Sequence, residues 1–229
     1  MAAGEPAVFI LGLALYVSFR LGYQILGFTF FRHPVLAGIL AWGLLGDVNL
    51  LWAALFFELF WLDLFHTGSY IPPDALLSCA VFLPLSLYFG WHDPGLFALP
   101  LLACLPLGRA GSMVEAILRR ACASGYHALN RSIDQGGDIQ ATAESIARSG
   151  FLLALLVWTA LYLVLAALLW GIFSCWAWLA GPAGILFPVR WEYLLGLAAA
   201  GGLLALRLPA ALALFVGCAV VMGGVFIWG

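Results

Sequence analysis

The chain has 229 residues, of which 65% are hydrophobic and 9% are charged, and its mean hydropathy is +1.09. This composition excludes a soluble domain, because a domain of this length has too little interior to bury so much apolar surface. The formal net charge of −2 is too small to indicate a nucleic-acid partner or a strongly acidic one. The sequence therefore predicts an all-α integral membrane protein, a multi-span helical bundle that contacts the lipid bilayer.

The first predicted span covers residues 6–27. We expect it to stay in the mature chain, because no basic region precedes it and no small-residue cleavage site follows it. Arg20 lies inside this span, so its side chain must either extend to the membrane surface or face protein. The next apolar segment, 35–45, is about half as long as a membrane span and is closed by Gly46 and Asp47.

Three further segments complete the first half of the chain. Residues 48–65 and 73–89 are predicted helices on either side of a proline pair, and 96–107 is short and carries Pro100 and Pro106. Short hydrophobic segments broken by proline are typical of the discontinuous or re-entrant helices that build the binding sites of transporters. We therefore expect a membrane region with broken helices, and the presumed substrate site, within residues 1–107.

A polar connector is predicted over residues 108–150. It holds five of the nine arginines and is expected to be cytoplasmic by the positive-inside rule. Apolar residues recur at helical spacing over 114–129, which predicts an amphipathic helix at the membrane interface, and residues 134–138 read as a turn. Glu115 and Arg119, four residues apart, are expected to form a surface pair.

The last region, 151–229, is predicted to hold C-terminal membrane helices. One long span covers 151–179, and two closing spans cover about 191–206 and 208–228. Because element boundaries read from sequence are uncertain by several residues, the number of crossings stays open by about two.

Two carboxylates, Glu58 and Asp74, stand in these otherwise apolar runs. An ionisable residue at bilayer depth is costly and is a functional candidate by default. Pro72 and Pro73 interrupt the helix beside Asp74, which exposes backbone polar groups that a protein-lined cavity could satisfy. An alternative is that each acid caps a helix or pairs with an arginine such as Arg32.

An ordered set of short motifs runs through the first half of the chain. It consists of Arg32, Pro34, Gly38, Gly46-Asp47, Glu58 to Leu62, Gly68 and Pro72 to Ala75. In order and spacing this set resembles the N-terminal half of the IIC subunit of the mannose/fructose/sorbose family of bacterial phosphotransferase (PTS) sugar transporters. The resemblance covers about residues 32–130.

The resemblance implies a sugar-translocating permease in the bacterial inner membrane, crossing it several times. Such a subunit pairs with a homologous IID membrane subunit, in a trimer of IIC/IID pairs, and moves a hexose inward. The sugar is then phosphorylated by a cytoplasmic IIB subunit, with phosphate supplied from phosphoenolpyruvate through IIA. The subunit is not an enzyme by itself, and it is expected to hold no catalytic residue, cofactor or metal ion.

The chain departs from the family pattern at three places beside the presumed site. His33 is inserted between Arg32 and Pro34, the sequence Trp52-Ala53-Ala54 replaces the usual glycines, and Asp63 stands where glycine is usual. The identity of the sugar therefore cannot be carried over.

A hexose offers hydroxyl groups in pairs, and a carboxylate can accept a pair with its two oxygens in strong hydrogen bonds. We assign this role to Glu58 and Asp74. Polar donors from the turn between them and stacking aromatic rings are secondary candidates: Thr67, Gly68 and Ser69 for the donors, Trp61 and Tyr70 for the rings.

Two other functions stay open. The same carboxylates could act as proton sites in a proton- or ion-coupled carrier for another small polar solute. In a third hypothesis, Glu58, Asp63 and His66 form the metal site of an intramembrane enzyme.

Overall fold

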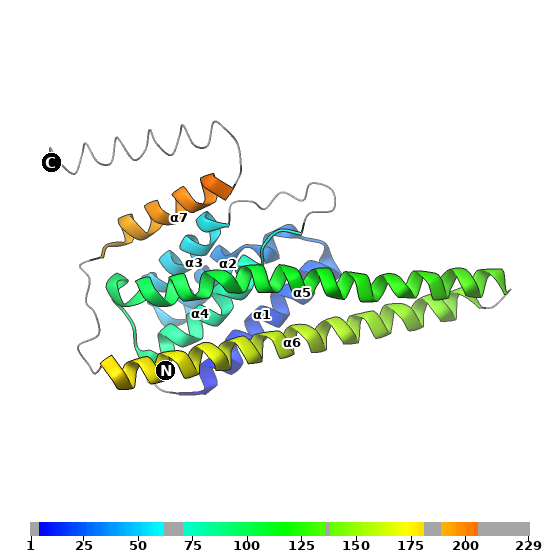
Figure 1. The fold of residues 1–229 in the computed structure, drawn as a ribbon, viewed down its shortest axis with the longest axis horizontal. Helices are drawn as coiled ribbons and strands as arrows, with labels where there is room; N and C mark the ends of the chain where they lie inside the picture. The colour runs from blue at the N-terminus through cyan, green and yellow to red at the C-terminus, as the bar shows by residue number, and fades with distance from the viewer. Residues whose placement is uncertain (1–4, 62–70, 136–137, 181–188, 206–229) are drawn as a thin grey trace.

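The computed structural model describes residues 5–61, 71–135, 138–180 and 189–205. All regular structure in these ranges is helical. Figure 1 shows two long antiparallel helices, α5 and α6, with the shorter helices packed against one end of this hairpin. In chain order the elements are α1 (Ala7–Leu26), the short 3₁₀ helix η1 (Thr29–Arg32), α2 (Pro34–Leu45), α3 (Val48–Phe60), α4 (Ala75–Phe89), α5 (Pro94–Asp134), α6 (Ile139–Ala180) and α7 (Trp191–Ala205).

The helices of the described ranges have the lengths and surfaces of a membrane protein. Three of them, α1, α5 and α6, are long and apolar enough to cross a bilayer. Large apolar side chains point outward from the bundle, for example Ile10, Leu44 and Val164, which are 70%, 82% and 63% exposed. Such a surface is suited to contact with lipid. The predicted fold class, an all-α membrane protein built as a helical bundle, is confirmed.

Helix α4 lies at the centre of the bundle, where it packs against α1, α2, α3, α5 and α6. Every residue from 75 to 86 is buried. This burial follows from the sequence, because α4 is apolar on all of its faces and a helix of that kind needs partners all round. Its polar side chains, among them Ser78 and Ser86, are therefore held inside the protein.

Pro84 lies inside α4, yet the helix continues through it. Because proline has no backbone N–H, the carbonyl of Ala80 loses its usual helical donor. The Tyr162 hydroxyl of α6 lies 3.4 Å from that carbonyl oxygen and 3.2 Å from the Phe9 carbonyl oxygen of α1. Gly12 leaves room for this contact, since a Cβ there would collide with the Tyr162 hydroxyl and lie 2.8 Å from Pro84. The tyrosine thus joins three helices at the point where the proline weakens one of them.

The short helices α2 and α3 form a tight hairpin. Gly46 ends α2 with a positive φ of 75°, a conformation that glycine adopts without steric cost. Asp47 then starts α3, and its Oδ1 accepts the backbone N–H of Asn49 at 2.9 Å. Gly38 lies directly against Ala54, so the two helices approach closely. The hairpin places the end of α3 beside the start of α2.

Several predicted boundaries agree with the structure. The helices expected at 6–27, 35–45 and 191–206 correspond to α1, α2 and α7. The helix expected at 48–65 is wrong at its C-terminus, because α3 ends at Phe60. Asp63 and the expected span 208–228 lie outside the described residues.

The predicted short segment at 96–107 is wrong as a separate element. Helix α5 passes through Pro100 and Pro106 and continues into the polar connector as one helix of 41 residues. Leu101, Cys104 and Leu107 are buried against the bundle, and this packing outweighs the hydrogen bonds that the prolines remove.

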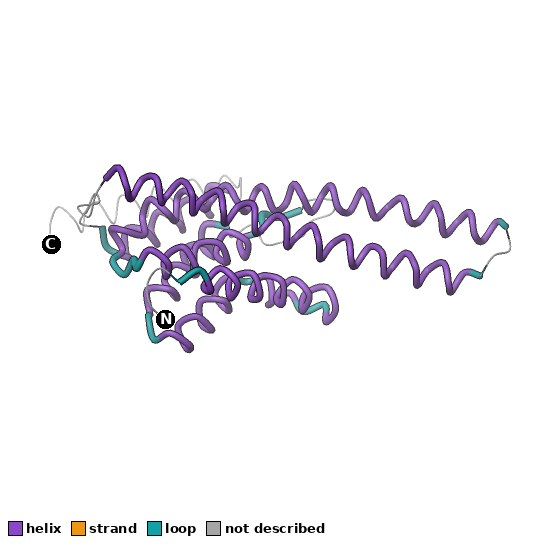
Figure 2. The backbone as a smooth tube through the Cα atoms, turned by 90° about the horizontal axis from the view of Figure 1, so that it is seen from below, coloured by secondary structure: helices purple, strands orange, loops and turns teal. Residues whose placement is uncertain are grey.

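Helical structure over 114–129 is confirmed, but it belongs to α5 and does not form a helix of its own. In both views the polar halves of α5 and α6 run together beyond the rest of the bundle (Figures 1 and 2). Helix α5 ends at Asp134 and α6 begins at Ile139, on either side of the turn expected at 134–138, of which residues 136 and 137 lie outside the described ranges. The domain boundaries expected at 107/108 and 150/151 fall inside these two helices.

Candidate functional site

Glu58 lies in the last turn of α3 and faces the start of α2. Its Oε1 is 2.5 Å from Nδ1 of His33, the residue that precedes α2. Pro34 occupies the first position of α2, and His33 has an extended backbone with φ of −80° and ψ of 119°. This geometry directs the imidazole across the α2–α3 hairpin toward the carboxylate. His33, the residue inserted into the motif pattern, therefore directly contacts Glu58, the residue predicted to bind the sugar.

Three buried polar atoms near the end of α3 have no hydrogen-bond partner within the described residues. They are Oε2 of Glu58, the indole Nε1 of Trp61 and Oγ of Ser78. Buried polar side-chain atoms in folded proteins are nearly always paired, and unpaired ones call for an explanation. A group of such atoms in one part of a bundle is what a site for a polar ligand requires.

Gly108 of α5 brings two of these atoms together. A Cβ on this glycine would lie 3.0 Å from Trp61 Nε1 and 3.2 Å from Ser78 Oγ, so both atoms face the same point on α5. The backbone N–H of Asp74 donates to the Gly108 carbonyl at 2.8 Å, which fixes the start of α4 against α5 and places Ser78 one turn further on. The missing side chain of Gly108 thus leaves space where an N–H donor and a hydroxyl meet.

Helix α4 links this point to Glu58. Cys79 follows Ser78, and its thiol lies 4.0 Å from the Pro34 carbonyl, beside His33. Glu58 and Trp61 are three residues apart at the end of α3. Glu58 and Trp61 therefore lie at the C-terminal end of α3, and Ser78 of α4 faces the same point on α5 as Trp61. We name Glu58, Trp61 and Ser78 the α3-end cluster.

Asp74 has a different environment. It caps α4 by accepting the Leu77 backbone N–H on Oδ1 at 3.2 Å. Its Oδ2 accepts from Arg20 at 2.6 Å and from the Tyr16 hydroxyl at 3.0 Å. This is the capped and ion-paired arrangement that the sequence left open, with Arg20 in place of Arg32. Direct binding of substrate by Asp74 stays a prediction, and it requires the sugar to displace one of these partners.

Arg20 is the centre of a buried network that joins four helices. Its side chain is 4% exposed and faces protein, one of the two arrangements expected from the sequence. The guanidinium lies 3.8 Å from Glu115 Oε2 of α5 and stacks over Trp158 of α6, 5.1 Å from the ring centroid. We name Arg20, Tyr16, Asp74, Glu115 and Trp158 the Arg20 network.

The expected Glu115–Arg119 pair is present, with Arg119 Nε 3.1 Å from Glu115 Oε1. It is more than a surface pair, however, because Glu115 is itself buried and also faces Arg20. Sequence reasoning missed this network. The available signal was that Arg20 lies within a span and must find an acid there. Arg32, the partner suggested for the acids, lies with its guanidinium carbon 5.0 Å from the Tyr23 ring centroid.

The other predicted site residues lie outside the described residues. These are the three turn donors Thr67, Gly68 and Ser69, the aromatic Tyr70, and the proposed metal ligands Asp63 and His66. The described chain stops at Trp61 and resumes at Ile71. Within the described ranges, no group of three His, Cys, Asp or Glu residues is placed to hold a metal ion.

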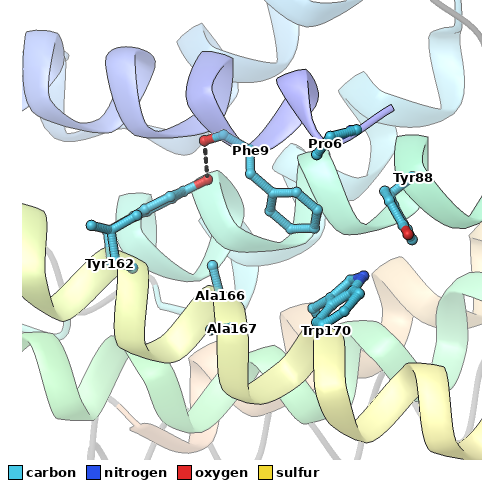
Figure 3. Close-up of a pocket in the computed structure, with 8 residues that line it drawn as sticks. Pro6, Phe9, Tyr88, Tyr162, Ala166, Ala167 and Trp170 are labelled. Carbon is cyan, nitrogen blue, oxygen red and sulfur yellow. Dashed lines mark hydrogen bonds between the residues drawn. The ribbon is translucent and has the colours of Figure 1, made fainter. Parts of the chain in front are cut away.

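A separate groove of about 260 Å³ lies between α1, α4 and α6 (Figure 3). It is lined by apolar and aromatic residues, among them Phe9, Tyr88, Ala166 and Trp170, and Tyr162 bonds to the Phe9 carbonyl at one side of it. The described residues that line this groove include no charged side chain. It is therefore a poor site for a hydroxyl-rich molecule, in contrast to the α3-end cluster.

Comparisons with known proteins support the fold. No protein-family model matches the chain, and no curated protein matches it in sequence. A solved structure described as "Structure of membrane protein" is similar, with a TM-score of 0.59 and 18% sequence identity over 97% of this chain and 94% of that chain. At this identity the similarity concerns the fold, which is that of a helical membrane protein.

Proposed function

We propose that this chain is the membrane subunit of a sugar transporter and that the α3-end cluster binds the sugar. The observation that carries the proposal is that Glu58, Trp61 and Ser78, at the end of α3 and on α4, each hold a buried polar atom without a hydrogen-bond partner in the described ranges. A hexose is neutral and presents hydroxyl groups that both donate and accept. The cluster offers a carboxylate acceptor, an indole donor and a hydroxyl that can do either, which is a matching set.

The resemblance to the IIC subunits of the mannose/fructose/sorbose phosphotransferase family makes the proposal more specific. In that form the chain translocates a hexose inward across the bacterial inner membrane, in a trimer of pairs with a IID subunit. A IIB subunit, charged by IIA, phosphorylates the sugar at the cytoplasmic side. The short helices α2 and α3 around the cluster fit a region that moves to carry the sugar, because discontinuous helices are where transporters hold their substrates.

Ligand-dependent stability tests the proposal directly. The purified chain, alone and with a IID-type partner, is heated with mannose, fructose or sorbose, and the midpoint of thermal unfolding is recorded. A ligand that binds the folded state raises this midpoint in a concentration-dependent manner. We expect at least one of the three sugars to do so.

The variant Glu58→Gln should abolish this stabilisation, because the amide keeps the size of the side chain but loses the charged acceptor. Asp93→Asn is the matched control, since Asp93 is an exposed acid that precedes α5 without a side-chain capping bond. Equal stabilisation of the wild type and Glu58→Gln would remove Glu58 from the site. No stabilisation of the wild type by any of the sugars would count against the proposed function itself.

One observation favours a second candidate, an ion-coupled carrier. Among the described residues, Oε2 of Glu115 is buried without a hydrogen-bond partner, and it lies 3.8 Å from Arg20. The Glu115 side chain lines a groove of about 350 Å³ between the end of α1 and helices α5 and α6. A carboxylate that lines a groove inside a membrane protein is a candidate ion site. Solute-independent proton uptake into vesicles that is lost in Glu115→Gln would favour this candidate over the sugar subunit.

A further inference from the structure

His33 is bonded to one of the two Glu58 carboxylate oxygens that the proposed sugar site needs. Its Nδ1 lies 2.5 Å from Glu58 Oε1, while Glu58 Oε2 is buried and has no hydrogen-bond partner among the residues that the structure describes. A carboxylate that binds a pair of neighbouring sugar hydroxyls uses both oxygens. In the structure, therefore, the histidine stands where the second hydroxyl would bind.

The main-chain hydrogen bonds of His33 allow its imidazole ring to rotate away from Glu58 without unfolding α2. The backbone N–H of His33 donates to the Phe30 carbonyl at 3.0 Å, and its carbonyl accepts the Leu36 N–H at 3.2 Å. These bonds hold the main chain whatever the rotamer of the ring. The His33 side chain is 38% exposed, compared with 15% for Glu58, so the imidazole is the partner that can rotate toward the outside.

We propose that the His33 imidazole is a placeholder that the sugar displaces from Glu58, and that it thereby sets the affinity and selectivity of the site. This inference rests on the proposed sugar-binding function. A ligand must offer two hydroxyls with the right spacing. One replaces His33 as the donor to Glu58 Oε1, and the other donates to Oε2. A ligand with a single suitable hydroxyl gains one hydrogen bond only by losing another, so it is rejected.

Affinity measurements on His33 variants test the displacement. His33→Ala removes the competing donor, and a charged hydrogen bond of this kind corresponds to at least about a tenfold change in an equilibrium constant. We therefore expect His33→Ala to bind the best of mannose, fructose and sorbose about tenfold more tightly than the wild type. His33→Gln keeps a donor and should bind with nearly wild-type affinity. If His33 merely supported the fold of the site, the alanine variant would bind more weakly, and that result would overturn the proposal.

Chemical labelling of the wild type gives a second test, which does not depend on a variant that folds. Diethyl pyrocarbonate modifies accessible imidazole nitrogens, and mass spectrometry reports the rate at each histidine. Saturating sugar should increase the rate at His33, because the ring is released from Glu58. His92 and His127, which are exposed, should react at unchanged rates. A sugar that binds but leaves His33 unchanged or protected would overturn the placeholder role and leave the proposed function intact. Failure of all three sugars to bind would instead count against the proposed function.

Discussion

The α3-end cluster and the Arg20 network both place a carboxylate inside the bundle, but the two carboxylates differ in how fully their oxygens are hydrogen-bonded. In the Arg20 network, Asp74 receives an arginine, a tyrosine hydroxyl and a backbone N–H. In the α3-end cluster, and counting only the part of the chain that the structure describes, Glu58 has one histidine partner and an unpaired oxygen, and the Trp61 indole and the Ser78 hydroxyl are unpaired. A buried charge with a full set of partners holds helices together. A buried charge with unused bonding capacity is suited to a ligand, and this difference gives four predictions.

The largest effect is expected from Arg20→Met. The change removes the only cation that the structure places against the buried Asp74 in the described ranges and leaves Glu115 with Arg119 alone, and breaking a buried pair in this way typically costs about 3–5 kcal/mol. Unfolding monitored by tryptophan fluorescence in detergent should show a loss of this size. Arg109→Met is the control, because Arg109 is exposed on α5 and should change stability by less than about 0.5 kcal/mol. Equal losses in the two variants would contradict the role of the network.

The same change from carboxylate to amide should lower the unfolding free energy by different amounts at Asp74 and at Glu58. Asp74→Asn leaves Arg20 without its closest charged partner, so we expect a loss of about 2–4 kcal/mol in unfolding free energy. Glu58→Gln loses a partly exposed pair with His33, so we expect a loss of less than about 1 kcal/mol. Denaturant titrations of both variants test this contrast. If Glu58→Gln were the more destabilising change, Glu58 would have to be regarded as structural.

Helices that form separate apolar runs in the sequence were predictable. The length of such a run and the residues that end a helix are local features of the sequence. Gly46 and Asp47 mark the α2–α3 junction in the sequence, and both residues act there as expected. Helix α5 was not predictable in the same way. Its prolines suggest a break, and only the packing of Leu101, Cys104 and Leu107 in the bundle explains why the helix continues.

The candidate site was predictable in part. Glu58 could be selected because a charge in an apolar run is unusual, but its contact with His33 depends on how α2 and α3 fold together. Ser78 carries no signal in the sequence, since a serine in a buried helix commonly bonds to its own backbone, as Ser86 does. Its unpaired hydroxyl is visible only once α3 and α5 are in place. The pairing of Asp74 with Arg20 likewise joins residues 54 positions apart in the chain.

Gly108→Ala probes the space within the cluster. Alanine favours a helix over glycine by about 1 kcal/mol. On α6, a Cβ added at Gly171 would meet no described atom within 4 Å outside its own helix backbone, so Gly171→Ala should stabilise the protein by about that amount. At Gly108 the new Cβ lies 3.0 Å from Trp61 and 3.2 Å from Ser78, and this crowding should cancel the gain. Thermal unfolding of both variants measures the difference. Equal stabilisation would show that the space beside Gly108 is wider than the structure indicates.

Ser78→Ala should have the smallest effect on stability, and the direction of the change in stability is the informative result. Ser78 and Ser86 are both fully buried on α4, but the Ser86 hydroxyl donates to the Leu83 carbonyl at 2.8 Å, while the Ser78 hydroxyl has no partner within the described ranges. Removing a satisfied hydroxyl costs about 1 kcal/mol, whereas removing an unsatisfied one relieves its desolvation and should raise stability by up to about 1 kcal/mol. Opposite shifts in the unfolding of the two variants, with weaker sugar binding in Ser78→Ala alone, would mean that the hydroxyl is kept at a cost to the fold because a ligand uses it. A loss of stability in Ser78→Ala equal to that in Ser86→Ala would remove Ser78 from the cluster.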